Sequence, residues 1–172
     1  MSTEISKKSD ELSKEIIEKL VIGGDCSRMS PEQKVQYMSY RCNSLGIDIA
    51  EKPFEFMKLN GKEVMYALKA CTDALCRTRK LKREVLSREK VDDVYLVCCR
   101  ATDESGRYDE SIGAVSIAGL KGDALCNAIM KAETKSKRRA VLSLCGLGML
   151  DESELETIQD RNKNYNAAHT HP

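Results

Sequence analysis

The 172-residue chain contains no tryptophan, only two phenylalanines and only two histidines. Both histidines, His169 and His171, lie within the last four residues, so the body of the chain lacks the commonest general base of enzymes. No stretch approaches the roughly 20 consecutive apolar residues that a membrane-spanning helix needs. We therefore expect neither an enzyme nor a membrane protein, but a domain with an aliphatic, sulfur-rich core.

Zinc-binding cysteine pairs are also lacking, although the chain has eight cysteines. No two cysteines have the two-residue separation of a metal-binding pair. Several lie in apolar segments such as "LVCC" and "LSLCG", where cysteine acts as a small hydrophobic residue. Because no signal peptide is recognisable, we expect reduced thiols and a cytoplasmic location. The missing cysteine pairs and the terminal position of both histidines lead us to expect no metal, and we expect no cofactor.

The formal net charge is only +1, but the charges are unevenly distributed. Residues 77–139 carry fifteen basic and ten acidic side chains, a local net charge of +5. The segment from residue 151 onward carries two basic and five acidic side chains, a local net charge of −3. The basic excess therefore lies in the second half of the body, and the C-terminal tail is acidic.

The N-terminal part predicts two helices. Residues 9–22 have helical apolar spacing that stops at the glycine pair at 23–24. A second helix follows Ser30, with Ser30 as N-cap, Pro31 in the first turn and Gln33 completing a capping box. This helix ends before Gly46, and one of its faces carries Val35, Met38 and Cys42.

Strands follow these helices. Asn60-Gly61 is a strong two-residue turn signal and predicts a hairpin over residues 54–67. The segment "ACTDALCRTRKL" then predicts a helix that starts near residue 70. Residues 81–118 predict a three-stranded meander, with turns at 90–93 and at "DESGR". A long helix from Asp123 ends at the glycines at 146 and 148.

This order of elements predicts an α+β fold, in which an antiparallel sheet, made of the hairpin and the meander, packs against helices and a long basic helix closes the domain. We expect residues 1–24 to form a detachable N-terminal helix that is available for oligomer contacts. Residues 30–150 are expected to form the core, and residues 151–172 a flexible acidic tail.

The closing helix sorts its charges by face. At 100° per residue, Lys131, Lys135, Arg138 and Arg139 fall within an arc about 100° wide. The opposite side carries a predicted core stripe of Leu125, Ile129, Ala140 and Leu144. Lys137 and Glu133 lie outside the basic arc, and we expect Glu133 to pair with Lys137 or with another cation. The arc is either a phosphate-binding surface or an ordinary solvated helix face.

A second basic cluster covers residues 77–83. Five of its seven residues are basic, more than a favourable helix dipole explains. Arg100 and Arg107 flank the second meander turn and could extend this surface. Three tyrosines on the predicted strands could stack bases or simply pack within the sheet. Lys137 of the closing helix is also a candidate for nucleic-acid contact. The further candidates are Arg77, Arg79, Lys80, Lys82, Arg83, Arg100, Arg107, Tyr66, Tyr95 and Tyr108.

Two segments carry a family resemblance. The hairpin and helix in "PFEFMKLNGKEVMYALKACTDALCRTRKL" precede the meander and a helix containing "KAETKSKRRAVLSLCGLGMLDE". Over residues 30–152 this resembles the phage and prophage RecT/Redβ group of single-strand annealing proteins. The closing helix is also similar, more distantly, to the Lys-Arg-Ala-Leu helix of eukaryotic Rad-type annealing proteins.

The resemblance implies ATP-independent binding of single-stranded DNA and annealing of complementary strands in homologous recombination, by a homo-oligomeric ring or filament. It places Lys131, Lys135, Arg138 and Arg139 along the DNA backbone, and Lys80, Lys82 and Arg83 in a second row. The hairpin would lie near the DNA or a neighbouring subunit.

The partners that the resemblance implies are single-stranded DNA, the annealed duplex intermediate, and a phage exonuclease or the host single-strand-binding protein, in a bacterial cytoplasm. The alternative is a nucleic-acid-binding module that recognises single-stranded DNA or RNA without oligomerising.

Overall fold

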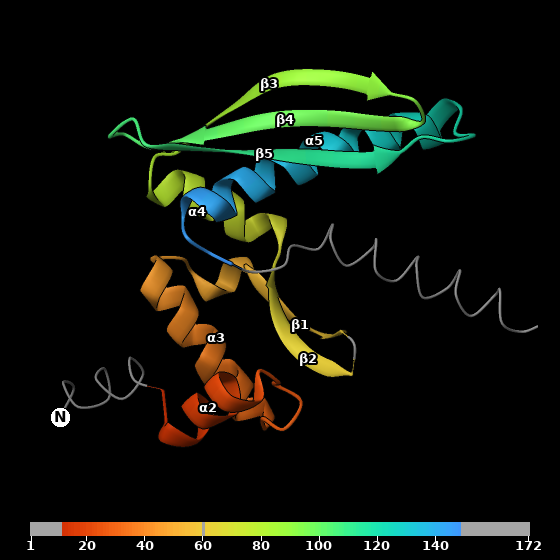
Figure 1. Cartoon of the computed structure of the whole chain (residues 1–172). Coiled ribbons are helices and arrows are strands. Elements are labelled where there is room, and N and C mark those ends of the chain that lie inside the picture. Colours follow the sequence, from red (N-terminus) through yellow and green to blue (C-terminus); the bar gives the residue numbers. More distant parts are fainter. Residues whose placement is uncertain (1–11, 60, 149–172) are drawn as a thin grey trace, which may run out of the picture. The chain divides into compact units, whose positions relative to one another are not determined.

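The computed structural model describes residues 12–59 and 61–148 (Figure 1). The chain forms two compact units, which divide between Thr78 and Arg79. We call them the N-terminal and C-terminal units. The sequence instead predicts a single core over residues 30–150. The predicted tail at 151–172 lies outside the described residues. The described elements are α2 (Lys14–Glu18), η1 (Lys19–Gly23), α3 (Pro31–Leu45), η2 (Ile49–Glu51), β1 (Phe54–Leu59), β2 (Lys62–Ala67), α4 (Lys69–Thr78), β3 (Lys82–Val91), β4 (Val94–Thr102), β5 (Tyr108–Ser116) and α5 (Gly122–Leu144).

The α+β prediction is confirmed, since helices are combined with antiparallel strands and α5 packs on the meander. The strands, however, form two sheets rather than one: β1 pairs with β2, and β3, β4 and β5 form a separate sheet in that order. None of the helices in the described part of the chain combines the length and apolar character needed to cross a bilayer.

The first helix is part of the core of the N-terminal unit. Ser13 caps α2, which continues as the π-helix η1 and ends at Gly24 in the left-handed conformation (φ 56°). Ile16 is fully buried with Cys26 and Met29, and Tyr37 packs against this cluster. A helix anchored in this way is not detachable, contrary to the expectation from sequence. Residues 9–11 of the predicted helix lie outside the described residues.

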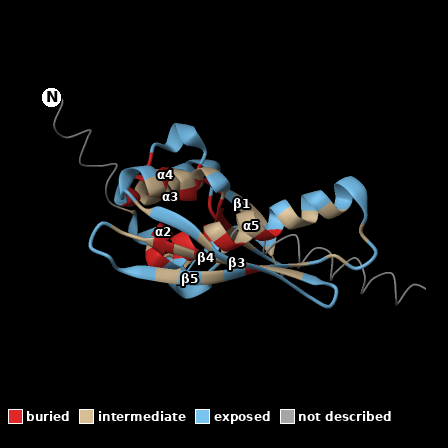
Figure 2. Cartoon of the chain, turned by 90° about the horizontal axis from the view of Figure 1, so that it is seen from above, coloured by how far each residue is buried: buried red, intermediate tan, exposed pale blue. Residues whose placement is uncertain are grey.

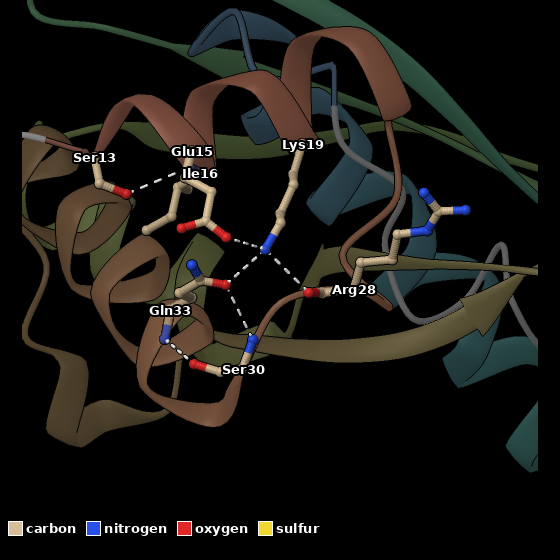
Figure 3. A network of polar contacts seen from close by, with 7 residues as sticks. All are labelled: Ser13, Glu15, Ile16, Lys19, Arg28, Ser30 and Gln33. Carbon is tan, nitrogen blue, oxygen red and sulfur yellow. Dashed lines mark hydrogen bonds and ion pairs between the residues drawn. The ribbon is translucent and has the colours of Figure 1, made fainter.

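A polar network ties this helix to α3 (Figure 3). The Lys19 ammonium donates to Glu15 Oε1 at 2.7 Å, to the Arg28 carbonyl at 3.1 Å and to Gln33 Oε1 at 3.0 Å. Gln33 also forms the predicted capping box with Ser30, which is confirmed. One amide side chain therefore both caps α3 and anchors Lys19, which fixes the start of α3 against the preceding helix.

The rest of the N-terminal unit follows the sequence signals closely. Helix α3 ends at Gly46 (φ 68°), and the β1–β2 register leaves a two-residue turn after Leu59. Asn60 lies outside the described residues, and Gly61 has the positive φ (78°) that this turn requires. Val35 is 60% exposed although Cys42 is buried, so the predicted apolar face of α3 is only partly covered.

Asp25 joins the loop after η1 to strand β2. Its Oδ1 accepts hydrogen bonds from the Glu63 N–H at 2.8 Å and the Ser27 N–H at 2.9 Å, and the Cys26 N–H donates to the Glu63 carbonyl at 2.8 Å. These donors lower the pKa of Asp25 to about 2, with the Glu63 N–H as the main cause. The ionised carboxylate therefore stabilises the folded N-terminal unit.

This geometry predicts a pH-dependent contribution of Asp25 to stability. Because the folded-state pKa lies below the unfolded value of about 3.9, the stabilisation is complete above that value and disappears as the pH falls towards 2. We expect Asp25→Asn to lower the urea midpoint at pH 6, with a smaller difference from wild type at pH 3. Urea unfolding at both pH values measures this, and a difference that grows at low pH would contradict it.

The C-terminal unit is a three-stranded meander with α5 along one face (Figure 1). Strand β4 runs over the predicted 94–102, and the predicted turn at 103–107 leads into β5. Val97, Cys99 and Ala101 are fully buried on the helix-bearing face. Side chains alternate along a strand, so the opposite face carries Arg100 and its neighbours. That opposite face includes the exposed Tyr108 and Ile112.

Small residues bring α5 and β5 into close contact. Ala132, Ser136 and Ala140 are spaced by one helical turn and are fully buried. The Ser136 hydroxyl donates to the Ser111 carbonyl of β5 at 2.8 Å. A Cβ atom added to Gly113 would lie 2.1 Å from the Ala132 carbonyl oxygen and 2.6 Å from the Ser136 nitrogen. Strand β5 therefore requires glycine here because helix backbone occupies the position of a side chain.

Replacement of Gly113 by alanine tests this contact. We expect Gly113→Ala to destabilise the C-terminal unit by about 3 kcal/mol, since the overlap is with backbone that cannot move without shifting α5. Gly148→Ala is the matched control, because an added Cβ at Gly148 meets no atom within 4 Å. Urea unfolding followed by circular dichroism measures both, and equal midpoints would show that α5 and β5 are less closely packed.

Candidate nucleic-acid interface

Helix α5 presents three of the four predicted cations of the basic arc. Lys131 and Arg139 are exposed, and Lys135 is half-buried. Arg138 is only 8% exposed, so its predicted place in the solvent-facing row is corrected. The projection assumed one buried stripe along the whole helix, whereas Val141 and Leu142 are also buried and widen the covered arc after residue 137. Figure 2 shows this change from an exposed start of α5 to a buried second half.

The predicted core stripe of α5 is also only partly right. Ala140 and Leu144 are buried, but Leu125 and Ile129 are half-buried. The most tightly packed positions are instead the small residues of the contact with β5. The core stripe was predicted from large apolar residues. That prediction missed the small residues at four-residue spacing, which form the closest contact.

Glu133 is held between two cations, which confirms the predicted pairing. Lys137 Nζ lies 2.5 Å from Glu133 Oε1, and Arg88 Nη2 lies 2.9 Å from Glu133 Oε2. The hydrogen bond from Lys137 is the first cause of the lowered pKa of Glu133, and the bond from Arg88 is the second. Arg88 belongs to β3 and was not predicted as a functional residue. The sequence offered no local signal for this contact, because it depends on how β3 packs beside α5.

The basic cluster at 77–83 does not form one row. Helix α4 ends at Thr78, Lys80 has a positive φ of 50°, and β3 begins at Lys82. Arg77, in the N-terminal unit, forms an ion pair with Glu51 (Arg77 Nη2 to Glu51 Oε2, 2.5 Å). In the C-terminal unit Lys80 Nζ lies 3.2 Å from Glu104 Oε1. The cluster is therefore divided between a helix end, a turn and a strand.

Arg79 and Arg107 line a cavity of about 270 Å³ at one end of the C-terminal unit. Arg107 Nε lies 3.1 Å from Asp103 Oδ2, which anchors the arginine to its own turn. The same cavity includes Cys145, and burial raises the pKa of the Cys145 thiol although Arg79 and Arg107 oppose that shift. Both predicted arginines thus reach one concave surface, which also contains acidic groups.

The three tyrosines have different surroundings. Tyr66 is 9% exposed and its hydroxyl donates to Glu55 Oε2 at 2.9 Å. Tyr95 packs against the core cluster around Val97. These two therefore pack within their sheets. Tyr108 is 57% exposed, and it is the tyrosine whose ring is accessible for stacking.

Arg100 lies over the ring of Tyr108, with its Cζ 4.5 Å from the ring centroid. Arg100 Nη2 also lies 2.5 Å from Glu110 Oε1, and hydrogen bonding to Glu110 is the first cause of a raised pKa of Arg100. The guanidinium is thereby fixed on the open sheet face, next to an exposed aromatic ring. Such a pair can stack with a planar base.

Comparison with known protein families finds no matching family model, and comparison with curated proteins finds no match.

Neighbouring arginines on α5 provide a test of the corrected surface. We expect Arg138→Gln to destabilise the protein by about 2 kcal/mol, because it removes a buried charged donor. Arg139→Gln, at an exposed position, should stay within about 0.5 kcal/mol of wild type. Urea unfolding of both variants measures the contrast. Equal effects would contradict the different burial of the two side chains.

Proposed function

We propose that this protein binds single-stranded DNA by its phosphate backbone and anneals complementary strands without ATP, as a homo-oligomer. The observation that carries the proposal is the row of Lys131, Lys135 and Arg139 on a helix that is held against the meander. Ammonium and guanidinium groups are the side chains that proteins use most for phosphate.

The row is positioned by backbone packing. Four residues of α-helix advance by about 6 Å, so successive cations of the row are about 6 Å apart along the helix axis. The contact of Ala132 and Ser136 with Gly113 keeps α5 from rotating or sliding on β5. Cations on a rigid helix lose less conformational freedom on binding than cations on a loop, which favours binding to a regularly spaced polyanion.

Annealing needs a strand whose bases stay available for pairing. Phosphate contacts hold a strand without reading or covering its base edges. Base pairing and stacking then drive the reaction, so no nucleotide hydrolysis is needed. The exposed Tyr108 with Arg100 provides a surface for base stacking, which is tolerant of sequence because every base has an aromatic face.

Oligomerisation is supported by exposed apolar residues in the N-terminal unit. Val21 is 79% exposed and Ile22 is 84% exposed, on η1, and Ile17 of α2 is 45% exposed. Because Ile16 anchors the same segment in the core, these neighbours are presented on a fixed support. Apolar residues grouped in this way are typical of protein–protein contacts, and we assign them to contacts between subunits.

The proposal predicts a specific salt dependence. Each phosphate contact to a single strand contributes about 0.7 to the slope of log affinity against log salt concentration. The triple variant Lys131→Gln, Lys135→Gln, Arg139→Gln should therefore lower the magnitude of that slope by about 2 and should slow annealing. Fluorescence anisotropy of a labelled 30-nucleotide dT strand at 50–300 mM NaCl, about the range over which such contacts weaken, measures the slope.

The control removes three exposed lysines from the N-terminal unit, in the variant Lys14→Gln, Lys52→Gln, Lys69→Gln. Its slope should match that of wild type. Absence of oligonucleotide binding by the wild-type protein at 50 mM NaCl would contradict the proposed function. Binding by a monomer that does not accelerate annealing of complementary oligonucleotides would instead support the simpler nucleic-acid-binding module.

A further inference from the structure

Strand β3 places three cations on the face of the sheet that bears α5, whereas Lys82, opposite Thr102, lies on the other face. Arg83, Arg88 and Lys90 lie opposite Ala101, Val97 and Tyr95 in the β3–β4 register. Directly opposed residues in an antiparallel pair project from the same face. Since Ala101 and Val97 are buried on the face that bears α5, the three cations project from that face as well.

The acidic residues of β3 lie on the other face. Glu84 is opposite Arg100, and Glu89 is opposite Leu96. The irregularity between Val85 and Ser87 keeps this division, because the additional residue, Leu86, restores the alternation for Arg88 and Lys90. The charged residues that β3 places on the helix-bearing face are therefore all cations, over a length of about 20 Å.

Helix α5 leaves this face of β3 accessible. It lies mainly over β5 and β4 and reaches β3 only along one edge. Arg83, Arg88 and Lys90 are exposed, and the Arg88 side chain is 52% exposed even though it pairs with Glu133. The edge of α5 that faces β3 adds Lys137, so the strip contains four cations and the single carboxylate of Glu133, a net charge of +3. We call these five residues the β3 track.

Glu133 lies between two cations of the track. Its two carboxylate oxygens accept hydrogen bonds from Lys137 of α5 and Arg88 of β3. An ionised carboxylate bridging an arginine and a lysine occupies the position that a phosphate group would take between the same donors. The Glu133 carboxylate thus holds the two cations in place, and it competes with an external anion for them.

We propose that the β3 track binds the phosphate backbone of a second single strand of nucleic acid. The proposal rests on the proposed function, which assigns the first strand to Lys131, Lys135 and Arg139. At 100° per residue those three lie within about 80° of each other, whereas Glu133 and Lys137 lie about 120–160° away from Arg139 around the helix. The body of α5 therefore separates the two rows, and each row can hold one strand of a pair.

The test compares the double variant Arg88→Gln, Lys90→Gln with the control Lys14→Gln, Lys69→Gln. Both control lysines form exposed ion pairs with a carboxylate four residues on, so the control also removes two cations. With a 30-nucleotide dT strand, which cannot pair with itself, we expect the nucleotides bound per protomer at saturation to fall to about half in the track variant. Its affinity for the first strand should stay close to wild type, and its rate of annealing should fall.

Glu133→Gln gives an effect of opposite sign. Removal of the competing carboxylate should strengthen binding of the second dT strand about threefold, whereas loss of a merely structural ion pair would weaken binding or leave it unchanged. Weaker or unchanged binding by Glu133→Gln would overturn the proposal. A track variant that binds as many nucleotides per protomer as wild type would overturn it too. Those results would leave the first row and the proposed function intact. If the wild-type protein bound no oligonucleotide at all, both the proposed function and the second-strand proposal would be wrong.

Discussion

The contact between Gly113 of β5 and the backbone of α5 at Ala132 and Ser136 is the constraint on which the C-terminal unit depends. It fixes the distance between helix and strand and also the rotation of the helix. That rotation decides which side chains of α5 are buried and which are presented. The positions of the exposed cations follow from it, because a helix turned by one residue would bury other positions and redirect every cation by about 100°.

Ion pairs with carboxylates position the cations of this protein, whose formal net charge is only +1. Glu133 holds Lys137 and Arg88, Glu110 holds Arg100, and Asp103 holds Arg107. Exposed ion pairs contribute little to stability, so their main effect here is to orient long side chains. A nearly neutral protein can thus present cations in fixed positions.

The N-terminal unit combines a fixed support with exposed apolar residues. Lys19, Gln33 and Asp25 join α2 and η1 to α3 and β2 through hydrogen bonds, and Ile16 adds a buried anchor. The neighbouring Val21 and Ile22 remain exposed on this support. The segment is therefore better suited to contact another molecule than a loosely attached helix would be.

Local rules encoded most of the secondary structure. The capping box at Ser30 and Gln33, the hairpin turn before Gly61 and the strand at 94–102 all follow from neighbouring residues, so they could be read from the sequence. The pairing of Glu133 with Lys137 was predictable for the same reason, since one helical turn separates them. Only the tertiary structure decided that the strands form two sheets, that Arg138 is buried beside the exposed Arg139, and that Arg88 joins Glu133. These outcomes depend on which surfaces meet across long sequence separations, and that is set by the fit of small residues such as Gly113, Ala132 and Ser136 rather than by any local pattern.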